Sequence, residues 1–314
     1  MTTIQQLVFK LSTPYAGRPY HVSGNALFQA IASDVDDQAR RELQVSHGMF
    51  APSEYGSYPE SHSQNGYAGK LGGSLPPVES YEDLFLFRDA AQRWLQTSRP
   101  RDAQNTMDRQ SHGGRLTVAP KSFFGVPAEQ RNSKRRVTWY IHAYIHSECE
   151  GVLPLDESVL NGIQLGGARN YGFGEVSLTD SQVVDLNALS FDSLRGHDAY
   201  TIELVTPYVV QSEAPDADAQ SVPWWWDTSV AGVPGDAPTR DRRLRRREER
   251  LVGESVYELA TVDHGQVVGY TGNDPVQTAK NGVRRLGTHA RFGFGELRVR
   301  PASHDRVPER GEVA

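Results

Sequence analysis

The sequence predicts an α+β protein made of two related halves, and three observations carry this prediction. A glycine-rich segment occurs twice, as LGGARNYGFGEV at 165–176 (glycine loop 1) and as LGTHARFGFGEL at 286–297 (glycine loop 2), with six identical positions. A second motif, Leu-x-Thr-Pro-Tyr, occurs within FKLSTPY at 9–15 and again within IELVTPY at 202–208. Residues 136–146 (RVTWYIHAYIH) alternate apolar and polar side chains as a strand does. Each half therefore opens with a similar strand and closes with a similar glycine-rich loop.

In the first half, β-branched and aromatic residues predict a strand at 4–11. A helix is expected at 24–45, interrupted near Ser33–Asp34, and apolar side chains at helical spacing predict another helix within 79–96. After the alternating strand, a short helix at 156–164 leads into glycine loop 1. The end of this half thus reads helix, glycine loop, strand.

The second half repeats this order with fewer residues. A strand is expected at 200–210, and a helix at 276–286 leads into glycine loop 2. Leu11 and Gly172 lie 161 residues apart, whereas the corresponding Leu204 and Gly293 lie 89 apart, so the first half carries roughly 70 extra residues. The expected organisation is a domain at 1–195 with an insertion at about 48–120, a domain at 196–301 with a Trp- and Arg-rich loop at 211–250, and an exposed charged tail at 302–314.

Composition excludes several classes of protein. The 33 Lys and Arg against 39 Asp and Glu give a net charge of -6, which excludes nucleic-acid binding through a global positive field. Any nucleic-acid surface must therefore be local. A mean hydropathy of -0.55, with no long apolar run and no signal-peptide pattern, predicts a cytoplasmic protein with no membrane partner. The single cysteine, Cys149, excludes an internal disulfide and a multi-cysteine metal site, and no metal or other cofactor is expected.

The glycine loops do not match the common nucleotide-binding motifs. A dinucleotide fingerprint lies between a strand and the helix that follows, whereas here each loop follows a helix and leads into a strand. Neither loop contains the Gly-Lys-Ser/Thr of a phosphate loop. Two interpretations stay open: the glycines allow the backbone amides to meet phosphate oxygens, or they only permit a tight turn.

These segments resemble the repeat-associated (RAMP) superfamily of CRISPR-Cas proteins, whose members are built on tandem ferredoxin-like, RNA-recognition-motif-like domains. The resemblance implies two such domains with glycine-rich loops and long insertions. It does not cover 48–120 or 211–250. The matching signatures are GGARNYGFGEV at 166–176 and GTHARFGFGEL at 287–297, with weaker matches in SGNALFQAIA at 23–32 and DHGQVVGYTG at 263–272.

Within that superfamily the two loops are most similar to those of the Cas five group and its type III relatives. This implies a non-enzymatic subunit that binds the 5′ handle of guide (CRISPR) RNA together with other Cas effector subunits. One alternative is a Cas six-like, metal-independent endoribonuclease with His47 as general base and His21 nearby. A second alternative is a non-catalytic assembly subunit. Under the first reading no residue is catalytic.

The residues expected to contact RNA lie in the two glycine loops and in two basic segments. The segment at 240–250 (RDRRLRRREER) holds seven arginines and is either a phosphate-binding surface or a solvated helix face with internal ion pairs. The candidates are Gly166, Gly167, Arg169, Asn170, Gly172, Gly174, Gly287, His289, Arg291, Gly293, Gly295, Lys134, Arg135, Arg136, Arg240, Arg242, Arg243, Arg245, Arg246 and Arg247.

Two groups of aromatic side chains are expected to contact either a binding partner or another part of the chain. The polar face of the strand at 136–146 carries Tyr140, His142, Tyr144 and His146, which either stack with RNA bases or lie beneath a loop or the other domain. A zinc site at His142 and His146 is disfavoured, because the pair lies on a strand and lacks the zincin glutamate. Since the three adjacent indoles of 224–226 cannot all face one core, at least one is expected against a partner or at the domain seam.

Overall fold

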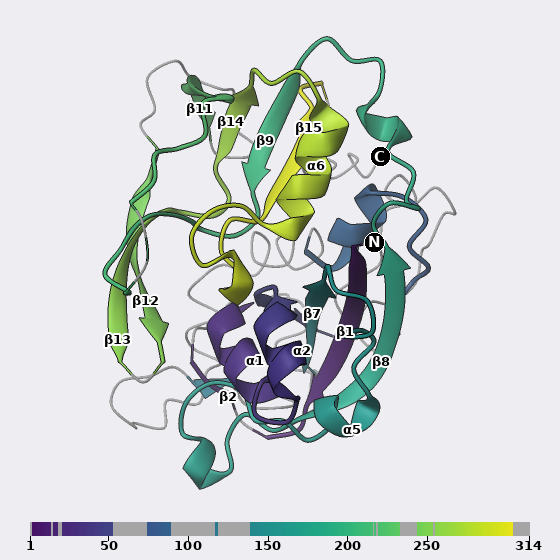
Figure 1. The fold of residues 1–314 in the computed structure, drawn as a ribbon, viewed down its shortest axis with the longest axis vertical. Helices are drawn as coiled ribbons and strands as arrows, with labels where there is room; N and C mark the ends of the chain where they lie inside the picture. Colours follow the sequence, from purple (N-terminus) through teal and green to yellow (C-terminus); the bar gives the residue numbers. More distant parts are fainter. Residues whose placement is uncertain are drawn as a thin grey trace, which may run out of the picture. The chain divides into compact units, whose positions relative to one another are not determined.

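The structure is a computed structural model of the 314-residue chain. It describes residues 2–13, 15–17, 21–52, 74–88, 117–118, 139–215, 217, 219–232, 244–253 and 255–303. The chain divides into two compact units, Met1–Leu189 and Ser190–Ala314. Both units combine antiparallel sheets with a few short helices (Figure 1). The predicted α+β fold class is confirmed.

The main sheet of the first unit has the strand order β3-β5-β7-β1-β8, and β4 also pairs with β7. Among the described residues of this unit, β1, β5, β7 and β8 are the four strands of five residues or more, and the first of them lies between the third and fourth, as in a ferredoxin-like sheet. A small separate sheet pairs β2 with β6. The strands are β1 (Thr3–Leu11), β2 (Tyr15–Ala16), β3 (His21–Val22), β4 (Gln44–Val45), β5 (Gly48–Pro52), β6 (Thr117–Val118), β7 (Trp139–Ser147) and β8 (Val176–Asp185).

The helices of the first unit are shorter than the sequence suggests. The interruption predicted near Ser33–Asp34 is confirmed: α1 (Gly24–Ile31) and α2 (Asp37–Glu42) are separate helices. The expected extension to residue 45 is wrong, because Gln44–Val45 leave the helix and pair with β7. Figure 1 shows α1 and α2 together over one face of the sheet.

The helix before glycine loop 1 also ends early. The expected span of 156–164 is wrong, since α5 covers only Glu157–Leu160. Gly162 adopts φ of 78°, a left-handed conformation that interrupts a right-handed helix.

The face of the main sheet that α1 and α2 leave free is covered by the insertion segment 74–88. This segment contains η2 (Glu82–Phe85) and adds Phe87 to the apolar cluster of Val8 and Ala51. The Phe87 ring stacks on His142 with centroids 4.3 Å apart. As a result His142, Tyr144 and His146 are buried. This face of the strand therefore lies beneath a covering segment and is not free to stack with RNA bases.

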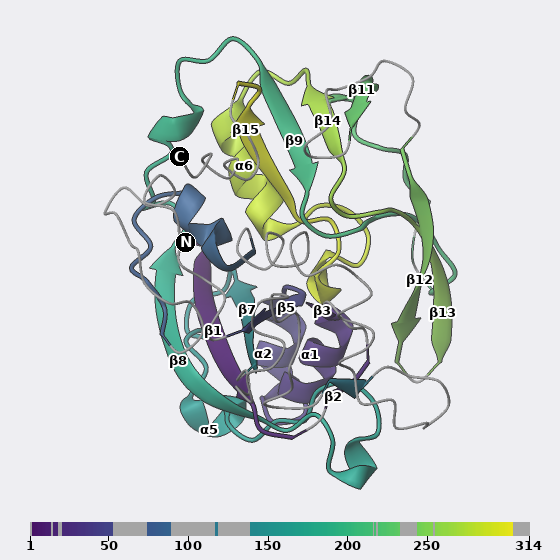
Figure 2. The ribbon, with the colours of Figure 1, turned by 180° about the vertical axis from the view of Figure 1, so that it is seen from behind.

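The second unit contains a four-stranded sheet, in the order β11-β14-β9-β15, and a three-stranded sheet, β10-β13-β12 (Figure 2). Along the chain β9, β11, β14 and β15 repeat the ferredoxin-like order. Among the described residues no helix lies between β9 and β11. The strands are β9 (Tyr200–Leu204), β10 (Tyr208–Ser212), β11 (Trp226–Gly232), β12 (Arg246–Val252), β13 (Val256–Val262), β14 (Val267–Tyr270) and β15 (Leu297–Pro301).

One helix, α6 (Pro275–Arg284), packs on this four-stranded sheet, while η5 (Asp192–Leu194) precedes β9. The packing is close: a Cβ on Gly282 would lie 2.4 Å from the Leu297 carbonyl oxygen. Within the described ranges no helix has the length and apolar character needed to cross a bilayer.

Two predictions for the second unit are wrong. The single strand expected at 200–210 is two strands in different sheets, because the chain turns at Pro207, which has no N–H for a ladder. The loop expected at 211–250 includes β11 and most of β12. In β12 Glu249 and Leu251 are buried while Arg250 and Val252 are exposed, which is the period of a strand and not of a solvated helix.

Candidate nucleic-acid interface

The two glycine loops have the same backbone conformation. Each contains four residues with left-handed φ at equivalent positions, and each closes with a hydrogen bond from its first leucine N–H to its last glycine carbonyl, of 2.8 Å in loop 1 and 2.9 Å in loop 2. Each also contains a single 3-10 turn, η4 (Arg169–Tyr171) or η6 (Ala290–Phe292). The left-handed positions are Gly166, Ala168, Gly172 and Gly174 in loop 1, and Gly287, His289, Gly293 and Gly295 in loop 2.

The last glycine of each loop has no room for a side chain. A Cβ on Gly174 would lie 1.9 Å from the Leu165 carbonyl oxygen, and a Cβ on Gly295 would lie 1.9 Å from that of Leu286. The glycines therefore permit a tight turn, which is one of the two interpretations that the sequence leaves open.

The two repeated motifs meet in each unit. The hydroxyl of Thr13, in the first Thr-Pro-Tyr, accepts a hydrogen bond from the Glu175 N–H at 2.9 Å, and Thr206 does the same for Glu296 at 2.9 Å. In return, the Glu175 carbonyl accepts the Thr13 N–H and the Glu296 carbonyl accepts the Thr206 N–H. Both repeats are visible in the sequence, and their joint recurrence is a signal for this contact that the predictions above do not use.

Loop 1 presents its tip to solvent. Arg169, Asn170 and Gly172 are exposed, and the Tyr171 side chain is 66% exposed. A cation, an amide and an aromatic ring thus project together from a backbone that is held at both ends. These groups can meet a phosphate, a hydroxyl and a base face, respectively.

Loop 2 packs its aromatic side chains within its own unit. Phe294 is buried in a cluster with Val209, Leu251 and Leu259 of the three-stranded sheet, and Phe292, the equivalent of Tyr171, packs against that cluster. His289 shares a 2.7 Å hydrogen bond with the Ser212 hydroxyl, and burial lowers the pKa of its imidazole. Loop 2 therefore packs against the sheet of β10, β12 and β13 and stabilises it.

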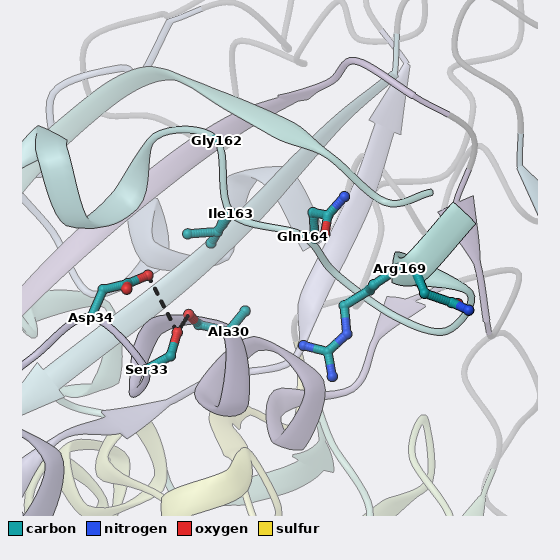
Figure 3. A pocket seen from close by; sticks show the side chains of 8 residues that line it. Ala30, Ser33, Asp34, Gly162, Ile163, Gln164 and Arg169 are labelled. Atoms are coloured by element: carbon teal, nitrogen blue, oxygen red, sulfur yellow. Dashed lines mark hydrogen bonds between the residues drawn. The ribbon is translucent and has the colours of Figure 1, made fainter. Parts of the chain in front are cut away.

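A groove of about 420 Å³ runs beside loop 1 (Figure 3). The end of α1 forms one wall and the loop forms the other. Ala30 on α1 and Ile163 on the opposite segment both line it and are buried, and Figure 3 shows Arg169 at one end and Asp34 at the other. The groove is lined by Ala30, Ser33, Asp34, Gly162, Ile163, Gln164, Arg169 and Asn170.

The described arginines of the basic segment lie on and beside β12. Arg245 and Arg247 reach Asp263 at 2.8 Å and 3.9 Å, with side chains 64% and 52% exposed. Asp263 is buried, which raises the pKa of its carboxyl. The hydrogen bond from His264 and the charges of His264, Arg245 and Arg247 outweigh this and lower the pKa to about 2. Arg246 is exposed, so the segment is partly neutralised but still offers guanidinium groups to solvent.

The remaining predicted RNA contacts lie outside the described residues. These are Lys134, Arg135, Arg136, Arg240, Arg242 and Arg243. The structure thus brings the loop 1 residues together at one tip and does not describe these six.

The two histidines considered for catalysis lie side by side in the first unit. The His21 and His47 rings are 5.1 Å apart, edge to face. His47 is only 4% exposed, a poor position for a base that must reach a ribose hydroxyl. Within the described part of the chain, no group of three or more His, Cys, Asp and Glu side chains is arranged to hold a metal ion.

The three indoles do not all face one core. Trp226 is buried against Tyr208, and Trp225 packs edge to face on Tyr270. Trp224 is 79% exposed. The Trp224 side chain is therefore available to a partner.

No protein-family model matches the chain, and no curated protein matches it in sequence. Among solved structures it is similar to a CRISPR protein from Archaeoglobus fulgidus, at 9% sequence identity and a TM-score of 0.32. The match covers 87% of this chain and 93% of that chain.

Proposed function

We propose that the chain is a guide-RNA-binding subunit of a multisubunit CRISPR effector ribonucleoprotein, and that glycine loop 1 grips the 5′ handle of the RNA. The observation that carries this proposal is the exposed tip of loop 1, whose backbone conformation recurs in loop 2. The likeness of both loops to those of the RAMP superfamily supports the choice of RNA as ligand.

The tip of loop 1 offers complementary contacts to single-stranded RNA. Arg169 presents a guanidinium to a phosphate, and Tyr171 presents a ring to a base, a stack that contributes ~1–3 kcal/mol. Because hydrogen bonds hold both ends of the loop, little conformational entropy is lost when RNA binds. Loop 1 is therefore proposed as a preformed contact for RNA.

The basic residues near β12 are a second proposed RNA contact, which belongs to the other unit. Arg245, Arg246 and Arg247 keep exposed guanidinium groups, and the basic residues outside the described ranges would add to them. Affinity should then fall steeply with salt, because each phosphate contact releases counterions.

The subunit is proposed to hold RNA and not to cut it, since burial of His47 disfavours its use as a general base. Exposed Trp224 is the proposed contact with a neighbouring effector subunit, because large exposed aromatic side chains are favoured anchors in protein interfaces.

The test is binding of fluorescently labelled CRISPR repeat RNA to the purified chain in EDTA. The Arg169→Ala/Tyr171→Ala double variant should bind at least about 10-fold more weakly than the wild type. Arg195→Ala, which removes an exposed cation paired with Asp192, is the control for net charge and should bind normally. Equal affinity of the double variant and the wild type would contradict the proposal. Cleavage that His47→Ala abolishes would instead support the endoribonuclease.

A further inference from the structure

The groove beside loop 1 carries opposite charges at its two ends. Arg169 and Asp34 are both exposed, and in the described part of the chain neither forms an ion pair. A ligand that fits both ends presents an anion to Arg169 and hydrogen-bond donors to Asp34.

We propose that this groove binds one guanosine nucleotide of the RNA. The Asp34 carboxylate accepts hydrogen bonds from the Watson–Crick edge of guanine, and Arg169 contacts the phosphate of the same nucleotide. This inference rests on the proposed function and adds base specificity to it.

Guanine is the base that matches a carboxylate. Its Watson–Crick edge carries two adjacent donors, N1–H and the N2 amine, which two carboxylate oxygens can accept together. Adenine and cytosine place a ring-nitrogen acceptor beside their single amine, and uracil flanks its one N–H with two carbonyl oxygens. Each of those acceptors would face the negative charge of Asp34 and be repelled.

The groove also has the size and lining that a nucleotide needs. Its volume of about 420 Å³ lies within the range of small-ligand sites, roughly 300–1,000 Å³. Ala30 and Ile163 are the apolar side chains of its lining that can contact the base, while the amides of Gln164 and Asn170 can meet the ribose hydroxyls. The Ser33 hydroxyl can donate its one proton either to the Ala30 carbonyl, at 2.9 Å, or to the Asp34 carboxylate, at 3.3 Å.

A second groove fixes the direction of the nucleotide. It has a volume of about 460 Å³, adjoins the first at Asp34, and continues past Asp36, Glu150 and Asp156. These exposed acids repel phosphates. The RNA backbone therefore stays at the Arg169 end and only the base reaches Asp34.

The experiment uses labelled ten-nucleotide RNAs of adenosine with one central guanosine, one central inosine, or neither. Inosine lacks the N2 amine and keeps the rest of the guanine edge. For the wild-type chain, the guanosine RNA should bind about 10-fold more tightly than all-adenosine RNA, and inosine should lose most of that gain. In Asp34→Asn the preference for guanosine should largely disappear, because a carboxamide has one acceptor oxygen and its NH2 group must face one of the two guanine donors.

Asp37→Asn is the matched control, since it removes the same charge from an exposed position on α2 that does not line the groove, and it should keep the preference for guanosine. Binding of all three RNAs by the wild type without preference would overturn this inference and leave the proposed function standing. Loss of the preference in Asp37→Asn as well would also overturn it. No binding of any RNA would overturn both proposals.

Discussion

The two glycine loops share one backbone but have different surroundings. Both carry the same four left-handed positions, and in both a threonine hydroxyl of the Thr-Pro-Tyr motif accepts a hydrogen bond from the glutamate N–H at the end of the loop. In loop 1 Tyr171 faces solvent, whereas in loop 2 its counterpart Phe292 packs against an apolar cluster beneath the three-stranded sheet. The fold thus fixes the loop backbone, and the side chains at the tip decide whether the loop is available to a ligand or supports a second sheet.

The largest expected effect tests the shared backbone. Gly174→Ala and Gly295→Ala should each lower the free energy of unfolding by about 3 kcal/mol or more, because the new Cβ meets a carbonyl oxygen and φ is positive. Urea unfolding of both variants checks this. Since the loops have the same geometry, a lower free energy of unfolding in only one of the two variants would show that the backbones are not equivalent.

The next prediction separates the two tips. Phe294→Ala removes a buried ring and should cost about 3–4 kcal/mol of unfolding free energy. Tyr171→Ala removes an exposed ring and should change stability by less than about 0.5 kcal/mol while weakening RNA binding. Urea unfolding and RNA titration of the same two variants measure both effects. A clear loss of stability in Tyr171→Ala would remove the contrast between the loops.

A pH effect is expected in the three-stranded sheet that loop 2 supports. The pKa of Asp263 is lowered to about 2 from an ordinary 3.8, so its ion pairs stabilise the fold fully above about pH 4 and are lost as the pH falls through about 2. The wild type should exceed Asp263→Asn by about 2 kcal/mol in unfolding free energy at pH 6. Urea unfolding at several pH values should show this difference shrinking toward pH 2. A difference that does not vary with pH would contradict the role given to Asp263.

The smallest expected effect concerns the threonine hydrogen bond. Thr206→Val leaves the buried Glu296 N–H without its acceptor and should cost about 1–2 kcal/mol of unfolding free energy. Thr13→Val should cost less than about 1 kcal/mol, because water can replace the lost acceptor for the more exposed Glu175 N–H. Thermal and urea unfolding of the pair measure the difference. A larger loss in Thr13→Val would contradict the burial difference between the loops.

Local patterns predicted the elements whose signals are local. The alternation of 136–146 and the repeat of the glycine segment identified β7 and the two loops, because period and glycine content are properties of adjacent residues. The break between α1 and α2 was likewise visible at Ser33–Asp34.

Features that depend on distant residues were missed. Nothing near His142 in the sequence shows that Phe87 stacks on it and covers the polar face of β7. The strand β12 was read as a loop or helix because its charges obscured a period of two that becomes visible only when Leu251 packs with Leu259 and Phe294. The difference between the two loop tips also depends on this sheet, so the sequence alone suggested two equal RNA contacts.

The most direct test of the central claim is photo-crosslinking of the wild-type chain to repeat RNA that contains 4-thiouridine, followed by mass spectrometry of the attached peptides. We predict crosslinks to the tip of loop 1, at residues 169–172, and none to the equivalent residues 290–293 of loop 2. Crosslinks at 290–293 without any at 169–172 would contradict the account.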